Sequence, residues 1–269
     1  MEQKMDNYTY QIAVESAKTH PIISQYTNLE ALKKIIENKT LRLTRIDKLN
    51  DHVENSKIHP LWAKKVYVAC FTHREHESYF FWNTYCKNKS YGVMISFPTD
   101  FLQNLPVHPD EKCQEAPLEF IKRTVPNVAF SKDVSRNTWA VFDYSCVDIS
   151  YIPRNITLEK SEFQNESSNF QGRLKYVEWD MENETRLRVS IRPKCREVSS
   201  MVNEQSYYKP DNGYLYVKLS TECLESMTIT LSPYSNSSLE KEVEQLLIDN
   251  NLYGRVKINK SILMEDLNE

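Results

Sequence analysis

The sequence predicts an α+β fold, with a mixed, mostly antiparallel central sheet flanked by helices in a single domain. Short segments in which apolar and polar residues alternate recur along the chain, as in strands that bury one face. Other segments space their apolar residues as an amphipathic helix does. Because no internal repeat and no obvious linker interrupts this pattern, we assign one domain to residues 1–269.

A strand, a helix and a second strand open the predicted fold. Residues 22–26 are partly β-branched and residues 40–45 alternate strictly, so both segments predict strands. The helix is predicted over residues 28–37, where Asn28 or Thr27 can cap its start. Its apolar residues recur at helical spacing: Leu29, Leu32, Ile35 and Ile36.

The remaining elements follow from the same two periodicities and from turn residues. Strands are predicted over residues 66–71, 91–97, 141–152, 174–179, 184–191, 213–219, 227–231 and 256–258. The segments 174–179 and 184–191 are either two consecutive strands or one long bent strand. Helices are predicted over residues 75–86, 117–125 and 238–248, and a loop or helix end over residues 161–171.

Composition excludes several classes of protein. The chain has 269 residues, a formal net charge of −3 and a pI near 6.1, so it is no polycation built to hold nucleic acid. No apolar stretch approaches the roughly 20 residues of a membrane span, and the first residues lack the apolar run of a signal peptide. We therefore expect a soluble, cytoplasmic protein that does not associate with membranes.

The cysteines and glycines narrow the choice further. The six cysteines are scattered without a CxxC pair, so we expect reduced thiols that are mostly buried. The chain has only four glycines, dispersed along its length, whereas dinucleotide-binding fingerprints and Walker phosphate loops need glycines clustered at one turn. A Rossmann dehydrogenase and a P-loop NTPase are therefore excluded.

The most informative segment for function is the acidic stretch at residues 175–186. Tyr176 and Trp179 offer its carboxylates a partly dry setting, in which a charge has stronger electrostatic effects. If the stretch is extended, Glu182 and Glu184 share a face, and such a pair can position a sugar hydroxyl or share a proton. The alternative interpretation is a solvated hairpin edge. The acids are Glu178, Asp180, Glu182 and Glu184.

A run of basic residues follows directly. Arg186 and Arg188 alternate with apolar residues, which predicts a strand with one guanidinium face and one core face. Arg192, Lys194 and Arg196 extend the positive charge, and such a face suits a pyrophosphate or a nucleic-acid backbone. Alternatively, these arginines neutralise the preceding acids and keep an edge strand soluble.

Two further groups of reactive residues have simpler interpretations. His73 and His76 could reach one metal ion on a helix, but no third ligand is evident. We therefore interpret this segment as a surface loop and predict no metal site. Cys70 lies inside the apolar strand over residues 66–71, which indicates a core residue rather than a nucleophile.

Several blocks spread over nearly the whole chain carry a family resemblance. They cover residues 25–30, 41–45, 48–51, 69–72, 81–85, 91–97 and 176–186, and an ending at residues 231–233 before the last helix and strand. In this order they resemble the blocks of the bacterial domain-of-unknown-function family 2971. The sequence departs from many relatives at His52, where a proline is usual, and at Ser232, where a glycine is usual. The resemblance implies a bacterial intracellular protein, often encoded near mobile or defence genes, with no settled activity.

The opening strand, helix and strand are also similar to the start of ADP-ribosyltransferases of the DNA-modifying and RNA-phosphate-removing kinds. This second resemblance implies NAD as a substrate. It places the nicotinamide ribose at Gln25, Tyr26 and Thr27, the nicotinamide ring on Trp82 or Tyr85, and the pyrophosphate at Arg45, Arg186 or Arg188. It also implies that Glu184 is the catalytic carboxylate, and Glu182 is the second acid of the pair predicted above. Many of these enzymes have His or Arg where this sequence has Gln25.

The leading hypothesis is therefore an ADP-ribosyltransferase-like or NAD-consuming enzyme, of the kind that serves as a bacterial defence or toxin effector. A carboxylate beside the ribose would stabilise the oxocarbenium-like state of glycosidic cleavage. One alternative is a non-catalytic nucleotide- or nucleic-acid-binding module that uses the arginine face. Another is a structural partner of neighbouring proteins, with 16 tyrosines and 10 phenylalanines available for an interface. The expected partners are a nucleotide ligand and a nucleic-acid or protein target, and the oligomeric state is left open.

Overall fold

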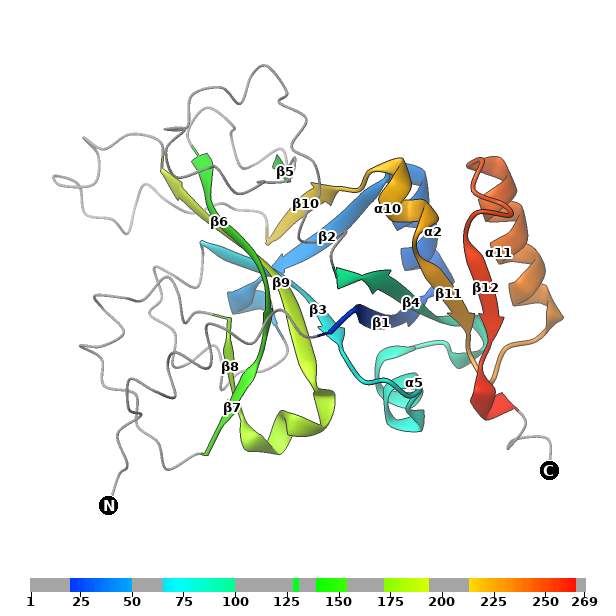
Figure 1. Ribbon diagram of the computed structural model, residues 1–269, viewed down its shortest axis with the longest axis horizontal. Helices are drawn as coiled ribbons and strands as arrows, with labels where there is room; N and C mark the ends of the chain where they lie inside the picture. Colours follow the sequence, from blue (N-terminus) through cyan, green and yellow to red (C-terminus); the bar gives the residue numbers. More distant parts are fainter. Residues whose placement is uncertain are drawn as a thin grey trace, which may run out of the picture. The chain divides into compact units, whose positions relative to one another are not determined.

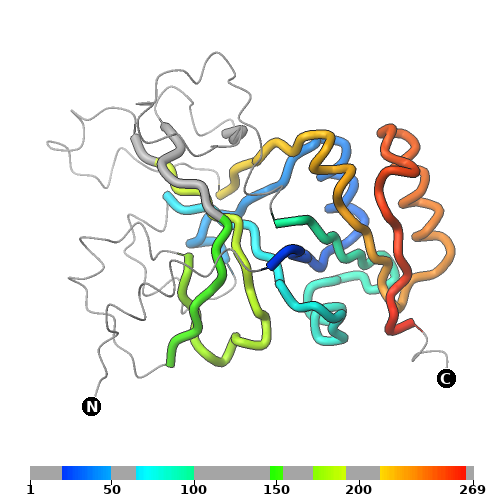
Figure 2. Tube along the Cα trace, in the orientation of Figure 1, coloured from blue at the N-terminus to red at the C-terminus, as the bar shows by residue number. Residues whose placement is uncertain are grey.

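The computed structural model describes residues 20–49, 65–99, 128–130, 139–153, 172–193 and 213–264. Their helices and their mixed, mostly antiparallel sheet confirm the predicted α+β class (Figure 1). The chain divides into two compact units, and Figure 2 follows the Cα trace from the N-terminus to the C-terminus. Unit 1 holds residues 1–19, 42–70 and 106–217, and unit 2 holds residues 20–41, 71–105 and 218–269. A single domain over residues 1–269 stays a prediction.

The sheet of unit 2 is built on strands β1 (Ile22–Asn28) and β4 (Gly92–Pro98). They pair antiparallel along their whole length, from Ile22 opposite Pro98 to Asn28 opposite Gly92. Strand β11 (Thr228–Leu231) pairs antiparallel with β4, and β12 (Lys257–Lys260) pairs parallel with β11. Every second side chain of β4 from Val93 to Phe97 enters the core, because successive side chains of a strand point to opposite faces.

Two amphipathic helices belong to unit 2. Helix α2 (Leu29–Asn38) begins where the Asn28 side chain accepts a hydrogen bond from the Ala31 amide at 2.9 Å, as the sequence predicts. Helix α11 (Ser237–Asp249) is capped in the same way by Asn236. Helix α2 contacts β1, β4 and α11. The buried residues are Leu29, Leu32, Ile35 and Ile36 of α2 and Leu239, Val243, Leu246 and Leu247 of α11.

Unit 2 also contains short helical segments. These are α5 (Tyr79–Tyr85), α10 (Thr221–Glu225) and the 3-10 turns η3 (Lys89–Tyr91) and η7 (Ile262–Met264). Helix α5 is the core of the aromatic helix expected over residues 75–86. The sequence analysis did not predict α10, which the Ser220 side chain caps by accepting a hydrogen bond from the Cys223 amide at 3.1 Å. None of the helices in the described ranges is long and apolar enough to cross a membrane.

In unit 1, β9 (Glu184–Pro193) lies between two partners. It pairs antiparallel with β6 (Trp139–Asp148), with a bulge between Val141 and Asp143, and it also pairs with β3 (Val66–Thr72). Strand β2 (Thr40–Arg45) pairs antiparallel with β3. Strand β10 (Tyr214–Lys218) pairs antiparallel with β5 (Val128–Phe130).

A separate two-stranded sheet completes unit 1. Strands β7 (Ser150–Ile152) and β8 (Leu174–Tyr176) pair parallel, and Tyr151 lies opposite Lys175. Two 3-10 segments, η2 (Ile46–Lys48) and η5 (Val177–Glu182), follow β2 and β8. These elements place the charged side chains described below.

Most predicted elements are confirmed, with two corrections. The strand expected over residues 174–179 ends at Tyr176, and the chain then forms η5 instead. The strand expected over residues 141–152 is two strands, β6 and β7, separated at Ile149. The helix predicted over residues 117–125 and the loop over 161–171 lie outside the described residues. The four described cysteines are free thiols: Cys70, Cys86, Cys146 and Cys223.

Candidate functional site

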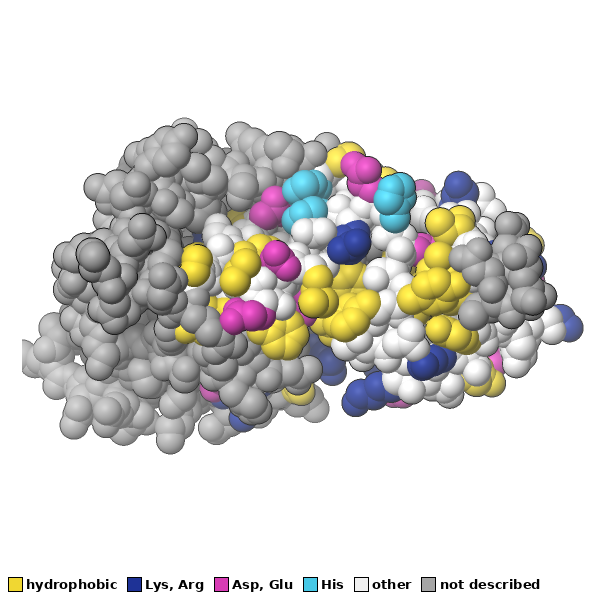
Figure 3. Space-filling view, turned by 90° about the horizontal axis from the view of Figure 1, so that it is seen from below, with side chains coloured by type: hydrophobic (Ala, Val, Ile, Leu, Met, Phe, Trp, Pro, Cys, Tyr) yellow, Lys and Arg dark blue, Asp and Glu magenta, His cyan; other side chains and the backbone are white. Residues whose placement is uncertain are grey.

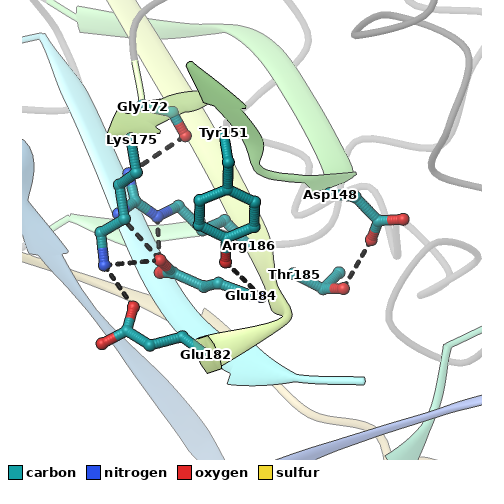
Figure 4. A network of polar contacts seen from close by, with 8 residues as sticks. All are labelled: Asp148, Tyr151, Gly172, Lys175, Glu182, Glu184, Thr185 and Arg186. Atoms are coloured by element: carbon teal, nitrogen blue, oxygen red, sulfur yellow. Dashed lines mark hydrogen bonds and ion pairs between the residues drawn. The ribbon is translucent and has the colours of Figure 1, made fainter. Parts of the chain in front are cut away.

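Four charged side chains of unit 1 form a connected set of ion pairs, with the buried carboxylate of Glu184 at its centre (Figure 4). Lys175 comes from β8, Glu182 from the last position of η5, and Glu184 and Arg186 from the start of β9. We call these four residues the charge network. None of the four side chains exposes more than 9% of its surface, so their charges are compensated mainly by one another.

Glu184 is at the centre of the charge network. Arg186 donates from Nε to Oε1 at 2.6 Å and from Nη2 to Oε2 at 3.2 Å, so the guanidinium grips both carboxylate oxygens. Lys175 Nζ lies 2.8 Å from Oε2 of the same carboxylate. The Cys70 thiol also hydrogen-bonds to Glu184, while the Glu184 backbone amide donates to the Tyr151 hydroxyl at 2.9 Å. Both carboxylate oxygens of Glu184 are therefore occupied.

Lys175 connects the two acids that the sequence singles out. Its ammonium donates to Glu182 Oε2 at 2.5 Å while it contacts Glu184, so the two carboxylates share one cation. The same ammonium lies 5.2 Å from the centre of the Trp179 ring, within cation–π range. Glu182 and Glu184 do not share one face of an extended stretch, because Glu182 ends η5 and Glu184 begins β9. Their carboxylates are joined through Lys175 instead.

Two unusual backbone positions hold the charge network in place. Asn183, between the two acids, has a φ of 40° in the left-handed region, which lets the chain turn from η5 into β9. Gly172 has a φ of 78°, and a Cβ there would lie 3.1 Å from Cδ1 of Ile46. Its carbonyl accepts a hydrogen bond from Arg186 Nη1 at 3.2 Å. A side chain at position 172 would therefore disturb a carbonyl that orients Arg186.

The charges of the network keep Glu184 ionised. Burial by itself would raise the pKa of Glu184, but Arg186 and Lys175 outweigh burial and lower the pKa to about 2. Burial likewise opposes the charged form of Lys175, yet Glu184 and Glu182 raise the pKa of its ammonium above the ordinary value. At neutral pH the centre is thus a carboxylate that carries no proton and is fixed by two cations.

The neighbours of the charge network are held in their neutral forms. Burial raises the pKa of the Cys70 thiol well above its ordinary value, and the negative charge of Glu184 raises it further. Burial raises the pKa of Tyr151 as well. The interpretation of Cys70 as a core residue rather than a nucleophile agrees with this environment.

A second group of predicted site residues meets in unit 2. Tyr26 of β1 packs edge-on against Trp82 of α5, with ring centres 4.8 Å apart, and accepts a hydrogen bond from the Ser78 amide at 3.1 Å. The Trp82 indole donates to Glu77 Oε2 at 3.1 Å. Trp82 is 0% exposed, so it offers no open face on which a nicotinamide ring could stack. Of the two aromatic candidates, Tyr85 alone is exposed.

The other residues predicted to bind NAD are divided between the two units. Thr27 accepts a hydrogen bond at its carbonyl from the Cys86 thiol at 3.0 Å, and Gln25 lies partly buried on β1, opposite Ile95 of β4. In unit 1, Arg45 is buried and binds both carboxylate oxygens of Asp47, at 2.6 and 3.0 Å. The structure thus assembles Glu182, Glu184 and Arg186 in unit 1, and Tyr26, Thr27 and Trp82 in unit 2. That the two groups line one cleft stays a prediction.

The arginine strand differs from the expectation of an exposed guanidinium face. Arg186 and Arg188 are both buried, so the guanidinium face of β9 is a covered face of the sheet rather than an exposed one. The alternative that arginines neutralise the preceding acids is confirmed for Arg186 and Glu184, but β9 is not an edge strand. The side chain of Arg192 and the residues Lys194 and Arg196 lie outside the described part of the chain.

The histidine pair expected in a surface loop is partly confirmed. His76 is exposed, as predicted, whereas His73 is half-buried and its ring stacks on His20 of the same unit, with ring centres 3.8 Å apart. A stacked partner explains the lower exposure of His73. Lys175 and Tyr151 were not predicted from the sequence as site residues. Only the pairing of β7 with β8 could have revealed them, and local sequence carries no signal for it.

Comparisons of this chain with protein-family models, with curated proteins and with solved structures found no significant match. The resemblance to family 2971 and the likeness to ADP-ribosyltransferases therefore stay predictions. Function has to be argued from the geometry and the electrostatics of the charge network.

Proposed function

We propose that the protein is an ADP-ribosyltransferase-like, NAD-consuming enzyme in which Glu184 is the catalytic carboxylate and Glu182 assists it. The supporting observation is that Glu184 is buried yet ionised, with a pKa lowered to about 2 by Arg186 and Lys175. Cleavage of the bond between nicotinamide and ribose develops positive charge on the ribose. A fixed negative charge in a dry site stabilises such a state most effectively.

The charge network provides this fixed negative charge. Arg186 holds both oxygens of Glu184, so the carboxylate does not have to reorient during the reaction. Lys175 contacts Glu184 at 2.8 Å and Glu182 at 2.5 Å, so it can remain bonded to Glu182 when a substrate approaches Glu184. In the proposed reaction the ribose takes the place of the Lys175 ammonium beside Glu184. The positive charge that develops on the ribose then replaces the charge of the ammonium.

The proposal assigns no pyrophosphate contact to the arginines. Arg45 already binds Asp47 and Arg186 already binds Glu184, so their guanidinium groups are engaged with carboxylates. Arg188 is fully buried. The alternative function, a non-catalytic nucleotide- or nucleic-acid-binding module, has less support because the arginine face that suggested it is covered.

The test measures nicotinamide release from NAD by the full chain, with and without added protein and nucleic-acid targets. Glu184→Gln removes the charge but keeps the shape, and we expect turnover to fall about 10²- to 10³-fold, as for loss of a group that stabilises transition-state charge. Asp148→Asn is the matched control. The variant likewise removes the charge of a carboxylate that is buried in the same unit, where Asp148 accepts a hydrogen bond from Thr185 Oγ1 at 2.5 Å.

Circular dichroism of each variant separates loss of catalysis from loss of folding. The proposal requires Glu184→Gln to lose turnover while its spectrum at 25 °C stays that of the wild type, and Asp148→Asn to keep most of its turnover. A folded wild-type protein that releases no nicotinamide with any of the added targets would contradict it.

A further inference from the structure

The segment beside the charge network exposes large apolar side chains. Val177, Trp179 and Met181 of η5 are 44%, 38% and 48% exposed. The acidic residues between them, Glu178 and Asp180, are exposed as well. Apolar and acidic side chains lie next to each other on the face drawn in Figure 3. Among these exposed side chains, Trp179 offers the aromatic face, which can bind a cation.

Trp179 is joined to the charge network through Lys175. The Lys175 ammonium lies 5.2 Å from the centre of the Trp179 ring, 2.8 Å from Glu184 and 2.5 Å from Glu182. The indole ring and the two carboxylates are therefore grouped around one cation. The face of an indole ring attracts positive charge, and neighbouring carboxylates increase that attraction.

We propose that Trp179 binds a flat, positively charged aromatic ring, and that this ring is the nicotinamide of NAD. The inference rests on the proposed function, and it differs from the resemblance, which placed nicotinamide on Trp82 or Tyr85. The nicotinamide ring of NAD is a pyridinium cation, and it takes the place of the Lys175 ammonium beside the indole. Trp82 is fully buried, whereas Trp179 is exposed and precedes Glu184 by five residues.

The charge of the ring gives the inference a specific consequence. When the glycosidic bond breaks, its electron pair stays on the nicotinamide nitrogen, so the released nicotinamide is neutral while the positive charge passes to the ribose. The neutral product lacks the cation–π attraction and binds Trp179 more weakly than the cation does. The site thus favours the substrate over the released ring, which assists release of the product.

The experiment compares two small probes, the N-methylnicotinamide cation and neutral nicotinamide, by isothermal titration calorimetry on the full chain. We expect the cation to bind wild-type protein about tenfold more tightly than the neutral ring. Trp179→Leu should weaken binding of the cation about tenfold and remove the preference, while Trp179→Phe should keep part of it. Tyr253→Leu is the control, because Tyr253 is an exposed aromatic residue that follows α11 in unit 2.

Equal binding of the two probes by wild-type protein, or wild-type binding by Trp179→Leu, would overturn the inference. Binding is measured without turnover, so the inference and the proposed function fail separately. Cation binding that depends on Trp179 without nicotinamide release supports the inference and contradicts the proposed function. Release that depends on Glu184, with an unchanged KM for NAD in Trp179→Leu, supports the function and contradicts the inference.

Discussion

Both units bury aliphatic side chains, but among the described residues the buried charged side chains all lie in unit 1. In unit 2 an aromatic cluster that includes Tyr26, Phe81 and Trp82 packs between β1 and α5 instead. In unit 1 the strand β9 buries a carboxylate and two guanidinium groups along one face, from Glu184 to Arg188. Buried ion pairs often stabilise a protein no better than well-packed apolar residues would. The charges of unit 1 therefore call for an explanation other than stability, and this favours unit 1 as the place of the chemistry.

We expect the largest effect on stability from a substitution that breaks the charge network at Arg186. Arg186→Met leaves Glu184 buried with Lys175 as its remaining cation, and we expect the free energy of unfolding to fall by about 3–5 kcal/mol. Urea denaturation followed by circular dichroism measures the change. Arg255→Met is the control, because the Arg255–Glu225 pair lies at the surface of unit 2 and its loss should cost about 0–1 kcal/mol. Similar losses in both variants would mean that the charges of unit 1 are solvated.

The next effect is the response of stability to acid. The pKa of Glu184 is about 2 in the folded protein, below its ordinary value of 4.5, so its stabilising contribution is present above about pH 4.5 and disappears as the pH falls toward 2. This contribution is about 3 kcal/mol. Glu184→Gln should be less stable than wild type at pH 7 and lose less stability between pH 5 and pH 2.

Urea denaturation at several values of pH from 2 to 7 measures this acid response. Glu30→Gln is the control, since the exposed Glu30 pairs with Lys34 on the surface of α2, where solvent screens the interaction. This control should keep most of the wild-type acid response. Parallel curves for the wild type and Glu184→Gln would contradict the low pKa of Glu184.

The smallest effect concerns the aromatic cluster of unit 2. Trp82→Phe removes ring volume and the hydrogen bond from the indole to Glu77, while Ser261 and Ile262 still donate to that carboxylate. We expect a loss of about 1–3 kcal/mol in the free energy of unfolding. Unlike Glu184→Gln, this variant should keep the wild-type change of stability between pH 5 and pH 2. An altered acid response would show that the two units do not differ as described.

Local sequence predicts those elements whose signals are local. Helix α2 was predicted within one residue at each end, because its apolar spacing and its Asn28 cap lie within the segment itself. The strand predicted over residues 174–179 was wrong beyond Tyr176, and the reason is physical. The apolar residues that follow Tyr176 alternate with acids, as in a strand that buries one face, but Val177, Trp179 and Met181 remain exposed on a 3-10 turn.

The candidate site could be predicted only in part. Glu182 and Glu184 stand out because they are close in sequence, and the alternation from Glu184 to Ile191 identifies the two faces of β9. Alternation cannot show which faces are covered, because that depends on what packs above and below the sheet, and both faces of β9 are buried. Lys175 meets Glu184 only after the chain has turned at Asn183, so contact between them required tertiary structure.

The left-handed backbone of Asn183 has a consequence for recognising relatives of this protein. Because the two acids flank a corner rather than alternate along a strand, the residue between them is restricted to types that tolerate this conformation, chiefly asparagine, aspartate and glycine. A sequence profile that gives position 183 the same weight as Glu182 and Glu184 would therefore separate relatives of this protein from chains that merely carry two closely spaced acids.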